Sequence, residues 1–151
     1  MTEHLIFQTP HWRISHRRDS RYAGYLMVSS RTRQPELHEL PDPALAELGP
    51  VLKTAERLLR RVYRPLKVVF YKLGFSKGFS CHFHVAPVTQ ALLEEVARHP
   101  QYDDDPDGND VILFLSRVYC ERELTPEEAS RQAITIDALR AASLDAPPQD
   151  S

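Results

Sequence analysis

The chain has 151 residues, of which 42% are hydrophobic and 26% charged, and its formal net charge is -2. This length and composition predict one globular domain with a core of its own, and the lack of a basic excess argues against a nucleic-acid partner. No stretch approaches the ~20 apolar residues of a membrane span, and the start MTEHLIFQTP lacks the apolar run of a signal peptide. Cys81 and Cys120 form neither a disulfide framework nor a CxxC pair, so we expect small buried residues in a cytoplasmic protein.

The first thirty residues predict a short strand followed by a β-hairpin. LIFQ at 5–8 is typical of a short strand, and WRIS at 12–15 alternates apolar and polar residues as a half-buried strand does. YLMVSS at 25–30 is rich in the aromatic and aliphatic residues that favour strands. The charged stretch at 16–24 breaks the alternation, so we place it near the turn of the hairpin.

An amphipathic helix follows a polar, proline-containing loop at 31–41. Asp42 is a good N-cap and Pro43 suits the first helical position, whereas Pro65 ends the helix. Apolar residues at spacings of three and four predict one buried stripe, and the Gly-Pro pair at 49–50 predicts a kink. The predicted stripe consists of Leu45, Leu48, Leu52, Ala55, Leu59 and Val62.

The next segment predicts two more strands joined by a loop. Residues 66–74 (LKVVFYKLG) are rich in β-favouring residues, and residues 79–88 (FSCHFHVAPV) predict the third clear strand of the chain. The FSKG loop with Gly78 joins them.

The C-terminal third predicts helices separated by a polar loop. Residues 89–99 indicate a short helix, and Thr125 begins a capping box whose helix runs to about residue 142. The acidic stretch at 103–110 indicates a surface loop, and the apolar run at 111–119 fits either a strand or a helix. Residues 145–151 are predicted to be a flexible tail.

Residues 80–87 (SCHFHVAP) contain the side chains with the most distinctive chemistry. Because side chains alternate along a strand, Ser80, His82 and His84 share one face, while the apolar residues between them turn to the core. Two neighbouring imidazoles can attack phosphorus and donate a hydrogen bond, can bind a metal, or can simply be half-buried polar residues. No third metal ligand stands at a familiar spacing.

The segment 84–87 (HVAP) resembles the end of the histidine-triad motif, in which alternating histidines are followed by two apolar residues and often proline. In that register His82 matches the central histidine and His84 the third, whereas Ser80 stands in place of the first. The order of hairpin, long helix, strand, glycine-containing loop and motif is also similar to this family over roughly residues 5 to 90.

Two features upstream bear on the same resemblance. Residues 19–22 (DSRY) look like a signature of one bacterial branch of the histidine-triad proteins. Tyr25 follows Gly24 where many members carry another histidine, a departure that this branch also tends to show.

The resemblance implies a nucleotide-binding hydrolase or nucleotidyl transferase that forms a nucleotidyl-histidine intermediate. Family substrates include dinucleoside polyphosphates and nucleoside phosphoramidates. By this resemblance His82 attacks the α-phosphorus while a backbone carbonyl holds its other ring nitrogen. His84 then donates a hydrogen bond to a non-bridging oxygen, and Ser80 contacts the bridging oxygen or leaving group.

The resemblance also implies residues that hold the rest of the nucleotide. Ser76 and Lys77, in the loop before the motif, can bind the remaining phosphates. Asp19 can accept hydrogen bonds from the ribose, and Arg18 can pair with phosphate. The alternative interpretation is structural: Lys77 as a loop lysine, Asp19 as a turn residue, and Arg17 with Arg18 as a solvated hairpin end.

We therefore predict an α+β fold, with a histidine-triad-like antiparallel sheet and flanking helices, as a single domain over residues 1–144. The expected ligand is a small-molecule nucleotide, with no required cofactor and no protein metal site, although a divalent cation can accompany the nucleotide. A homodimer is common in the family. Two alternatives stay open: a nucleotide-binding module with weak turnover, favoured by Ser80 and Tyr25, and a metal-binding protein that uses His82 and His84.

Overall fold

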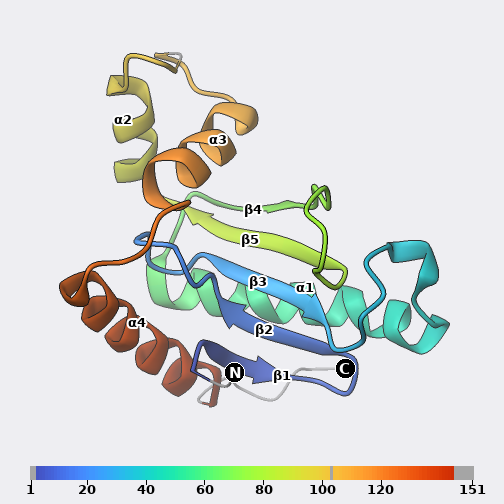
Figure 1. Cartoon of the computed structure of the whole chain (residues 1–151). Helices are drawn as coiled ribbons and strands as arrows, with labels where there is room; N and C mark the ends of the chain where they lie inside the picture. Colours follow the sequence, from blue (N-terminus) through green and yellow to red (C-terminus); the bar gives the residue numbers. More distant parts are fainter. Residues whose placement is uncertain (1–2, 103, 145–151) are drawn as a thin grey trace.

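Five antiparallel strands form one sheet in the order β1-β2-β3-β5-β4 (Figure 1). The computed structural model describes residues 3–102 and 104–144, so the predicted tail at 145–151 lies outside the described residues. The strands are β1 (Leu5–Gln8), β2 (Trp12–His16), β3 (Leu26–Ser30), β4 (Lys67–Tyr71) and β5 (His82–Val88). The helices are α1 (Asp42–Tyr63), α2 (Gln90–Arg98), α3 (Gly108–Tyr119) and α4 (Pro126–Leu144). The predicted α+β fold, its antiparallel sheet and its flanking helices are confirmed.

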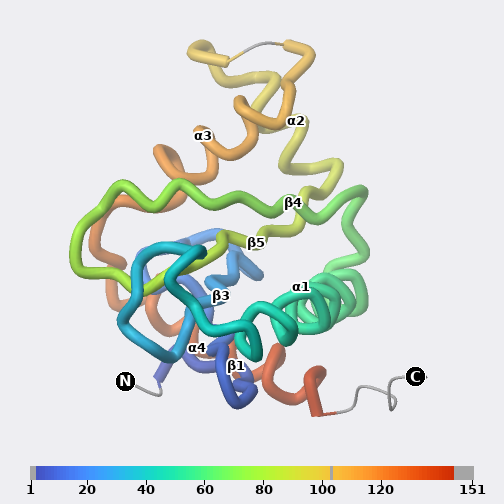
Figure 2. Tube along the Cα trace, turned by 90° about the vertical axis from the view of Figure 1, so that its right-hand side faces the viewer, coloured from blue at the N-terminus to red at the C-terminus, as the bar shows by residue number. Residues whose placement is uncertain are grey.

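Helix α1 covers one face of the sheet and builds the larger core with it (Figures 1 and 2). Val28 and Val85 point from the strands to Ala55 and Leu59 of the helix, and all four are buried. Trp12 is 0% exposed and donates its indole N–H to the carbonyl of Ala44 across 2.9 Å. A buried indole needs such a partner, so this bond fixes the position of α1 on β2.

Helices α2 and α3 pack on the opposite face, at one end of the sheet (Figure 1). Ala86 and Val88 of β5 point to this second core, because they alternate with Val85 and Pro87 along the strand. The helices contribute Leu92, Val96, Phe114 and Leu115. Strand β5 therefore has apolar neighbours on both faces over its second half.

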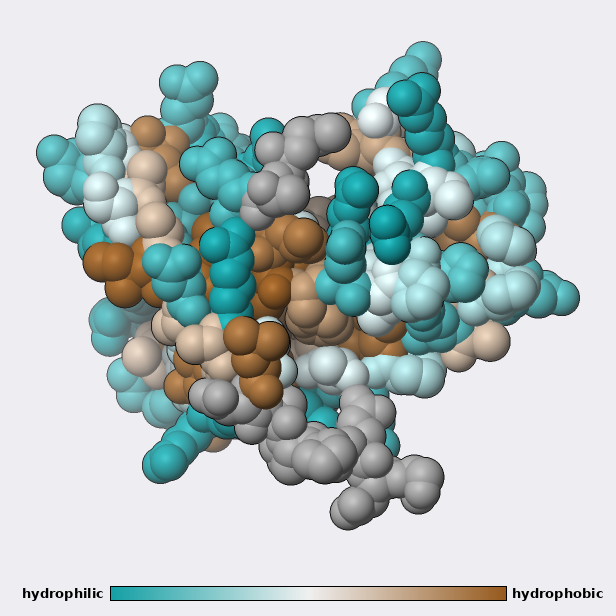
Figure 3. Space-filling model, turned by 90° about the horizontal axis from the view of Figure 1, so that it is seen from below, coloured by the Kyte–Doolittle hydropathy of each residue, from teal (hydrophilic) through white to brown (hydrophobic). Residues whose placement is uncertain are grey.

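Helix α4 packs beside β1 and α1 and completes the first core with Ile136 and Leu139. Other apolar side chains of this helix, Ile134 and Leu144, are exposed. Seen from below, hydrophilic side chains cover most of the surface, and hydrophobic atoms show in a hollow near its centre (Figure 3). Within the described residues, no helix is both long and apolar enough to cross a membrane.

The start and the buried face of α1 differ from the prediction. Pro41 is the N-cap, so Asp42 lies in the first turn instead. The helix continues through Pro50. Of the predicted stripe, Ala55 and Leu59 are buried and Leu48, Leu52 and Val62 pack against the same core, whereas Leu45 is 36% exposed. The buried face also includes Ala44, Val51 and Leu58, which the prediction did not name.

The C-terminal half resolves the ambiguity of the apolar run at 111–119, which is helical as part of α3. The side chain of Asp107 caps this helix by accepting from the backbone N–H of Asp110. The side chain of Asp110 in turn accepts from the backbone N–H of Asp107. The predicted loop at 103–110 therefore ends in a helix start. The capping box at Thr125 is confirmed, whereas the loop at 31–41 contains a 3-10 turn at Leu37–Glu39.

His16 closes the connection between β2 and β3 from inside. Its Nδ1 donates to the carbonyl of Arg17 at 3.0 Å, and its Nε2 accepts from the N–H of Gly24 at 3.1 Å. Gly24 has a φ of 88°, and a Cβ there would come within 2.5 Å of the ring of Tyr63. Burial lowers the pKa of His16 to about 4, although its bond to the Arg17 carbonyl opposes this. The connection 17–24 is therefore held by a neutral imidazole.

His16 should make stability depend on pH. Its pKa is lower in the folded than in the unfolded chain, so its contribution is present above about pH 6.5 and is lost as the pH falls toward 4. Between about pH 7.5 and about pH 5, we expect the unfolding free energy of the wild type to fall by about 2 kcal/mol more than that of His16→Gln. Urea denaturation at both pH values measures the difference. The exposed His38→Gln serves as the control, and an equal fall in wild type and His16→Gln would contradict the assignment.

Candidate active site

Strand β5 places two imidazoles side by side on the part of the sheet that α2 and α3 leave uncovered. The rings of His82 and His84 have centroids 5.3 Å apart, and both side chains are half-buried. Phe83 and Val85 alternate with them and pack in the core under α1. The predicted alternation of faces is confirmed, and the strand holds the two rings as neighbours.

A backbone carbonyl fixes the tautomer of His82. Its Nδ1 lies 2.8 Å from the carbonyl oxygen of Ser80, which can only accept. The proton of the neutral ring therefore sits on Nδ1, and Nε2 keeps a free lone pair. The ring of Phe79 lies 5.9 Å from that of His82. This is the arrangement that a nucleophilic imidazole requires.

His84 occupies a drier environment than an ordinary histidine. Its ring stacks on that of Tyr71, with centroids 4.5 Å apart and planes inclined by 10°. Burial, the charge of Arg17 and the neighbouring His82 together lower the pKa of His84 to about 3. His84 is therefore neutral at physiological pH, and one ring nitrogen carries a proton that it can donate.

Tyr25 joins His84 to a charged pair. Its hydroxyl lies 2.7 Å from Nδ1 of His84, contacts the hydroxyl of Tyr71, and accepts from Nη1 of Arg17 at 3.0 Å. Arg17 in turn donates to Asp19 at 2.7 Å. The interpretation of Arg17 as part of a solvated hairpin end is wrong. The sequence marked Tyr25 only as a departure from the family, although its position two residues before Met27 places it on the face of His84.

The other predicted residues lie at varying places. Ser80 is half-buried immediately before β5 and contributes its carbonyl to His82. Ser76 and Lys77 are exposed in the loop between β4 and β5. Gly78 has a φ of 87° in that loop, a conformation that glycine adopts readily. The loop therefore joins the histidine strand, but its side chains stand free in solvent.

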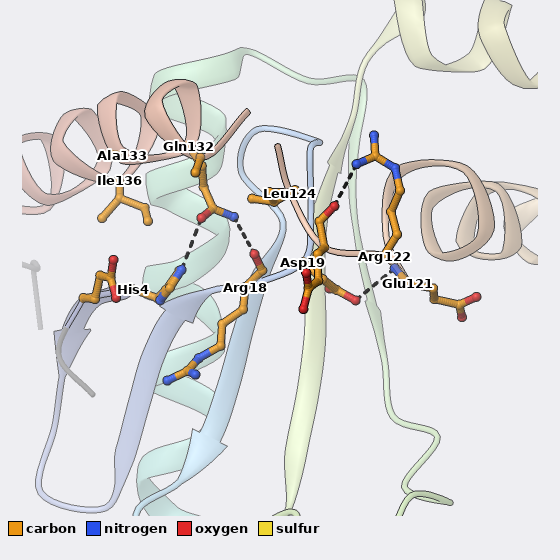
Figure 4. A pocket seen from close by; sticks show the side chains of 12 residues that line it. His4, Arg18, Asp19, Glu121, Arg122, Leu124, Gln132, Ala133 and Ile136 are labelled. Carbon is orange, nitrogen blue, oxygen red and sulfur yellow. Dashed lines mark hydrogen bonds between the residues drawn. The ribbon is translucent and has the colours of Figure 1, made fainter. Parts of the chain in front are cut away.

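Arg18 and Asp19 line a separate cavity of about 710 Å³, and neither His82 nor His84 is among its lining residues (Figure 4). The buried Gln132 forms part of the wall by accepting from His4 and donating to the carbonyl of Arg18. One carboxylate oxygen of Asp19 accepts from Arg17 and the other from the backbone N–H of Glu121. This cavity therefore borders the hydrogen-bonded network behind the histidines rather than the histidines themselves.

The two rings offer different chemical groups to a ligand. Among the residues that the structure describes, no group of three or more His, Cys, Asp and Glu side chains could hold a metal ion. The two cysteines are free and buried, as predicted. One ring with a free Nε2 lone pair beside a second, neutral ring offers a nucleophile and a hydrogen-bond donor.

The tautomer of His82 can be measured directly. We expect long-range ¹H–¹⁵N spectra to show His82 with a protonated Nδ1 and an unprotonated Nε2 at neutral pH, because the Ser80 carbonyl accepts only from Nδ1. His82→Ala assigns the signals. A dominant Nε2–H form would contradict the geometry of the candidate nucleophile.

No family model matches this sequence, and no curated protein matches it. Solved structures do resemble it. The C. elegans NitFhit protein is 16% identical with a TM-score of 0.61; the match covers 93% of this chain, which spans only 27% of that protein. A hypothetical histidine triad nucleotide-binding protein from Sulfolobus tokodaii strain 7 is 14% identical, with a TM-score of 0.63. The match covers 94% of this chain and 84% of that protein. A uridylyltransferase is 16% identical, with a TM-score of 0.62. The match covers 96% of this chain and 42% of that protein.

A zinc-bound histidine triad family protein from Mycobacterium smegmatis is also similar, at 15% identity and a TM-score of 0.57. The match covers 93% of this chain and 83% of that protein. At these identities the likeness concerns the fold alone. The five-stranded antiparallel sheet and its flanking helices agree with that likeness, and the fold of this chain is that of the histidine-triad proteins.

Proposed function

We propose that this protein is a nucleotide hydrolase or nucleotidyl transferase that acts on the α-phosphate of dinucleoside polyphosphates or nucleoside phosphoramidates. The observation that carries the proposal is the bond from Nδ1 of His82 to the Ser80 carbonyl, which leaves Nε2 as the free lone pair. The fold agrees with it, because two similar structures are a nucleotide-binding protein and a uridylyltransferase.

The first step forms a nucleotidyl-histidine. The lone pair on Nε2 of His82 attacks the α-phosphorus, and the bond from phosphorus to the leaving group breaks with its electron pair on the leaving group. The adduct ring is positively charged while Nδ1 keeps its proton, and the Ser80 carbonyl stabilises that charge through the existing bond. The oxygen of water or another acceptor then bonds to phosphorus and gives up its proton to solvent, while the N–P bond breaks with its electron pair on Nε2, and His82 returns to its neutral form.

His84 assists by donating a hydrogen bond to a non-bridging oxygen of the phosphate. Charge on this oxygen grows in the transition state, and a donor fixed in advance stabilises it without reorganising. A neutral ring serves well here, because its stack on Tyr71 already holds its plane. Ser80 contacts the bridging oxygen or the leaving group with its hydroxyl, in place of the first family histidine.

The remaining predicted residues bind the rest of the nucleotide. Ser76 and Lys77 are exposed and free to close on additional phosphates. Both oxygens of Asp19 already accept one bond, but each keeps a lone pair for a ribose hydroxyl. Arg18 is exposed and offers its guanidinium to a phosphate.

The reaction class is tested with a substrate panel. We incubate wild type, His82→Ala and the exposed-histidine control His38→Ala with several dinucleoside polyphosphates and adenosine phosphoramidate, and follow the release of nucleoside monophosphate. Loss of the nucleophile should lower turnover by roughly 10³-fold or more, while His38→Ala should match the wild type. Alkaline quenching during turnover should also trap a nucleotide mass on His82.

Two results bear against the enzyme. Equal release by wild type and His82→Ala would remove His82 as the nucleophile. Measurable nucleotide binding with no release from any substrate would leave a binding module, which is the second candidate function.

The second candidate rests on Ser80 and Tyr25, which stand where family members carry histidines. A serine hydroxyl is a weaker proton donor than an imidazolium, so the departing group receives less help. A site that binds nucleotide but turns it over slowly would have this composition.

Ser80→His separates the two candidates. If the native site is a weakened enzyme, the added imidazole should raise kcat at least about 10-fold with little change in nucleotide affinity. Ser80→Ala serves as the control for loss of the hydroxyl. Because the Ser80 carbonyl is part of the backbone, neither change removes the bond that orients His82. A Ser80→His variant that binds nucleotide but stays inactive would favour the binding module.

The proposal also covers the oligomeric state of the protein, its location and the cation that accompanies its nucleotide. We propose a cytoplasmic homodimer whose nucleotide brings a divalent cation with it. Strand β4 forms one edge of the sheet, and the exposed Leu66 and Phe70 lie before and on it. We propose that a second copy of the chain packs against this edge in the homodimer.

A further inference from the structure

Behind His84, three side chains form a network that the proposed chemistry does not yet use. The hydroxyl of Tyr25, whose ring is 0% exposed, has three polar neighbours: Nδ1 of His84, the hydroxyl of Tyr71 and Nη1 of Arg17. We infer that Tyr25 is a positioning residue that donates its proton to Nδ1 of His84 and thereby keeps the His84 proton on Nε2, where it faces the substrate phosphate. This inference rests on the proposed function and deepens it.

The number of protons on the Tyr25 oxygen limits the hydrogen bonds that it can form. A phenol oxygen has one proton to donate and two lone pairs. Arg17 can only donate, so it occupies one lone pair at 3.0 Å. One proton and one lone pair remain for His84 and Tyr71. Either Tyr25 donates to His84 and accepts from Tyr71, or it donates to Tyr71 and accepts from His84.

The relative acidity of the phenol and the imidazole favours the first arrangement, in which Tyr25 donates to His84. An ordinary phenol titrates near 10, and the basic nitrogen of a neutral imidazole accepts protons with a pKa of about 6.5. The phenol is therefore the natural donor and the imidazole nitrogen the natural acceptor. The Arg17 cation draws electron density from the Tyr25 oxygen, which strengthens it as a donor and weakens it as an acceptor of the His84 N–H.

Both phenols keep their protons in this environment. Burial raises the pKa of Tyr25, and Tyr71 raises it further. Burial likewise raises the pKa of Tyr71. His84 stays neutral because burial and Arg17 lower its pKa. The network therefore consists of neutral rings around one cation, and the only freedom left is the direction of the hydrogen bonds.

The far end of the network fixes Arg17. Its Nε donates to Asp19 at 2.7 Å, and the second oxygen of Asp19 accepts from the backbone N–H of Glu121 at 2.9 Å. Glu121 follows the C-terminal end of α3 and has a φ of 67°. The orientation of His84 is thus tied to the packing of α3 through three side chains, none of which touches the phosphate.

Two variants separate the hydroxyl of Tyr25 from the rest of the network. Tyr25→Phe removes the donor to His84 and keeps the ring. Tyr71→Phe removes the other hydroxyl and keeps the ring that stacks on His84, so it is the matched control. Tyr25→His restores a donor in a different side chain and serves as the rescue.

The first readout needs no substrate. Long-range ¹H–¹⁵N spectra at neutral pH should show wild-type His84 with a protonated Nε2 and an unprotonated Nδ1. Tyr25→Phe should give a mixture of both tautomers, whereas Tyr71→Phe should keep the wild-type form. A wild-type His84 with its proton on Nδ1 would overturn the inference, whatever the activity of the protein. Because that result comes from the wild type, it also decides the case if Tyr25→Phe fails to fold.

The second readout is kinetic and uses the substrate that the wild type turns over fastest. We expect Tyr25→Phe to lower kcat by roughly 10-fold to 100-fold with little change in KM and Tyr25→His to recover most of the loss. Tyr71→Phe, which keeps the ring that stacks on His84, should lower kcat clearly less than Tyr25→Phe. Equal losses in the two phenylalanine variants would reduce Tyr25 to a packing residue and overturn the inference. If the wild type turns over no substrate, the proposed function fails, and the spectra still decide the tautomer.

Discussion

The uneven burial of β5 determines where chemistry can occur on this sheet. Over its second half the strand separates two cores, since Val85 packs under α1 while Ala86 and Val88 pack against α2 and α3. Over its first half only the α1 side is covered, and the alternate positions, His82 and His84, remain half-buried. A strand anchored on both faces a few residues away cannot twist freely, so the rings keep their 5.3 Å separation without help from a ligand. Both polar rings also lie at the border of the second core, where water is partly excluded.

That border explains the different electrostatics of the two histidines. His82 is restrained by a backbone carbonyl, whereas His84 lies against Tyr71 and Tyr25 with the Arg17 cation behind them. Placing a partly buried cation there requires compensation, which Asp19 provides by an ion pair at 2.7 Å. Asp19 raises the pKa of His84, but burial and Arg17 outweigh it. The ion pair thus stabilises the fold while the ring beside it remains uncharged.

The sequence predicted the elements whose signals are local. The period-two alternation at 80–87 was enough to place both histidines on one face, and the capping box at Thr125 marked the start of α4. The buried face of α1 was predicted only in part, because Ala44, Val51 and Leu58 are buried by contact with the sheet and with α4, which periodicity alone does not specify. The network behind His84 joins residues from β4, β5 and the connection 17–25. The bond from Asp19 to Glu121 spans 102 positions. Such pairings depend on strand order and helix packing, which a single sequence does not specify.

The two departures from the histidine-triad pattern differ in what they remove. At Ser80 the side chain has changed, but the group that orients His82 is the backbone carbonyl of the same residue, and any side chain preserves it. At Tyr25 the ring has changed from one that can carry a second proton to one that cannot. A histidine there can also donate to His84, but its second ring nitrogen can bind a further proton, and two neighbouring imidazoles titrate together. A phenol whose pKa is raised by burial can only share the single proton it has. The substitution at position 25 therefore favours a fixed direction of hydrogen bonding, while the substitution at position 80 leaves the nucleophile in place and changes only what meets the leaving group.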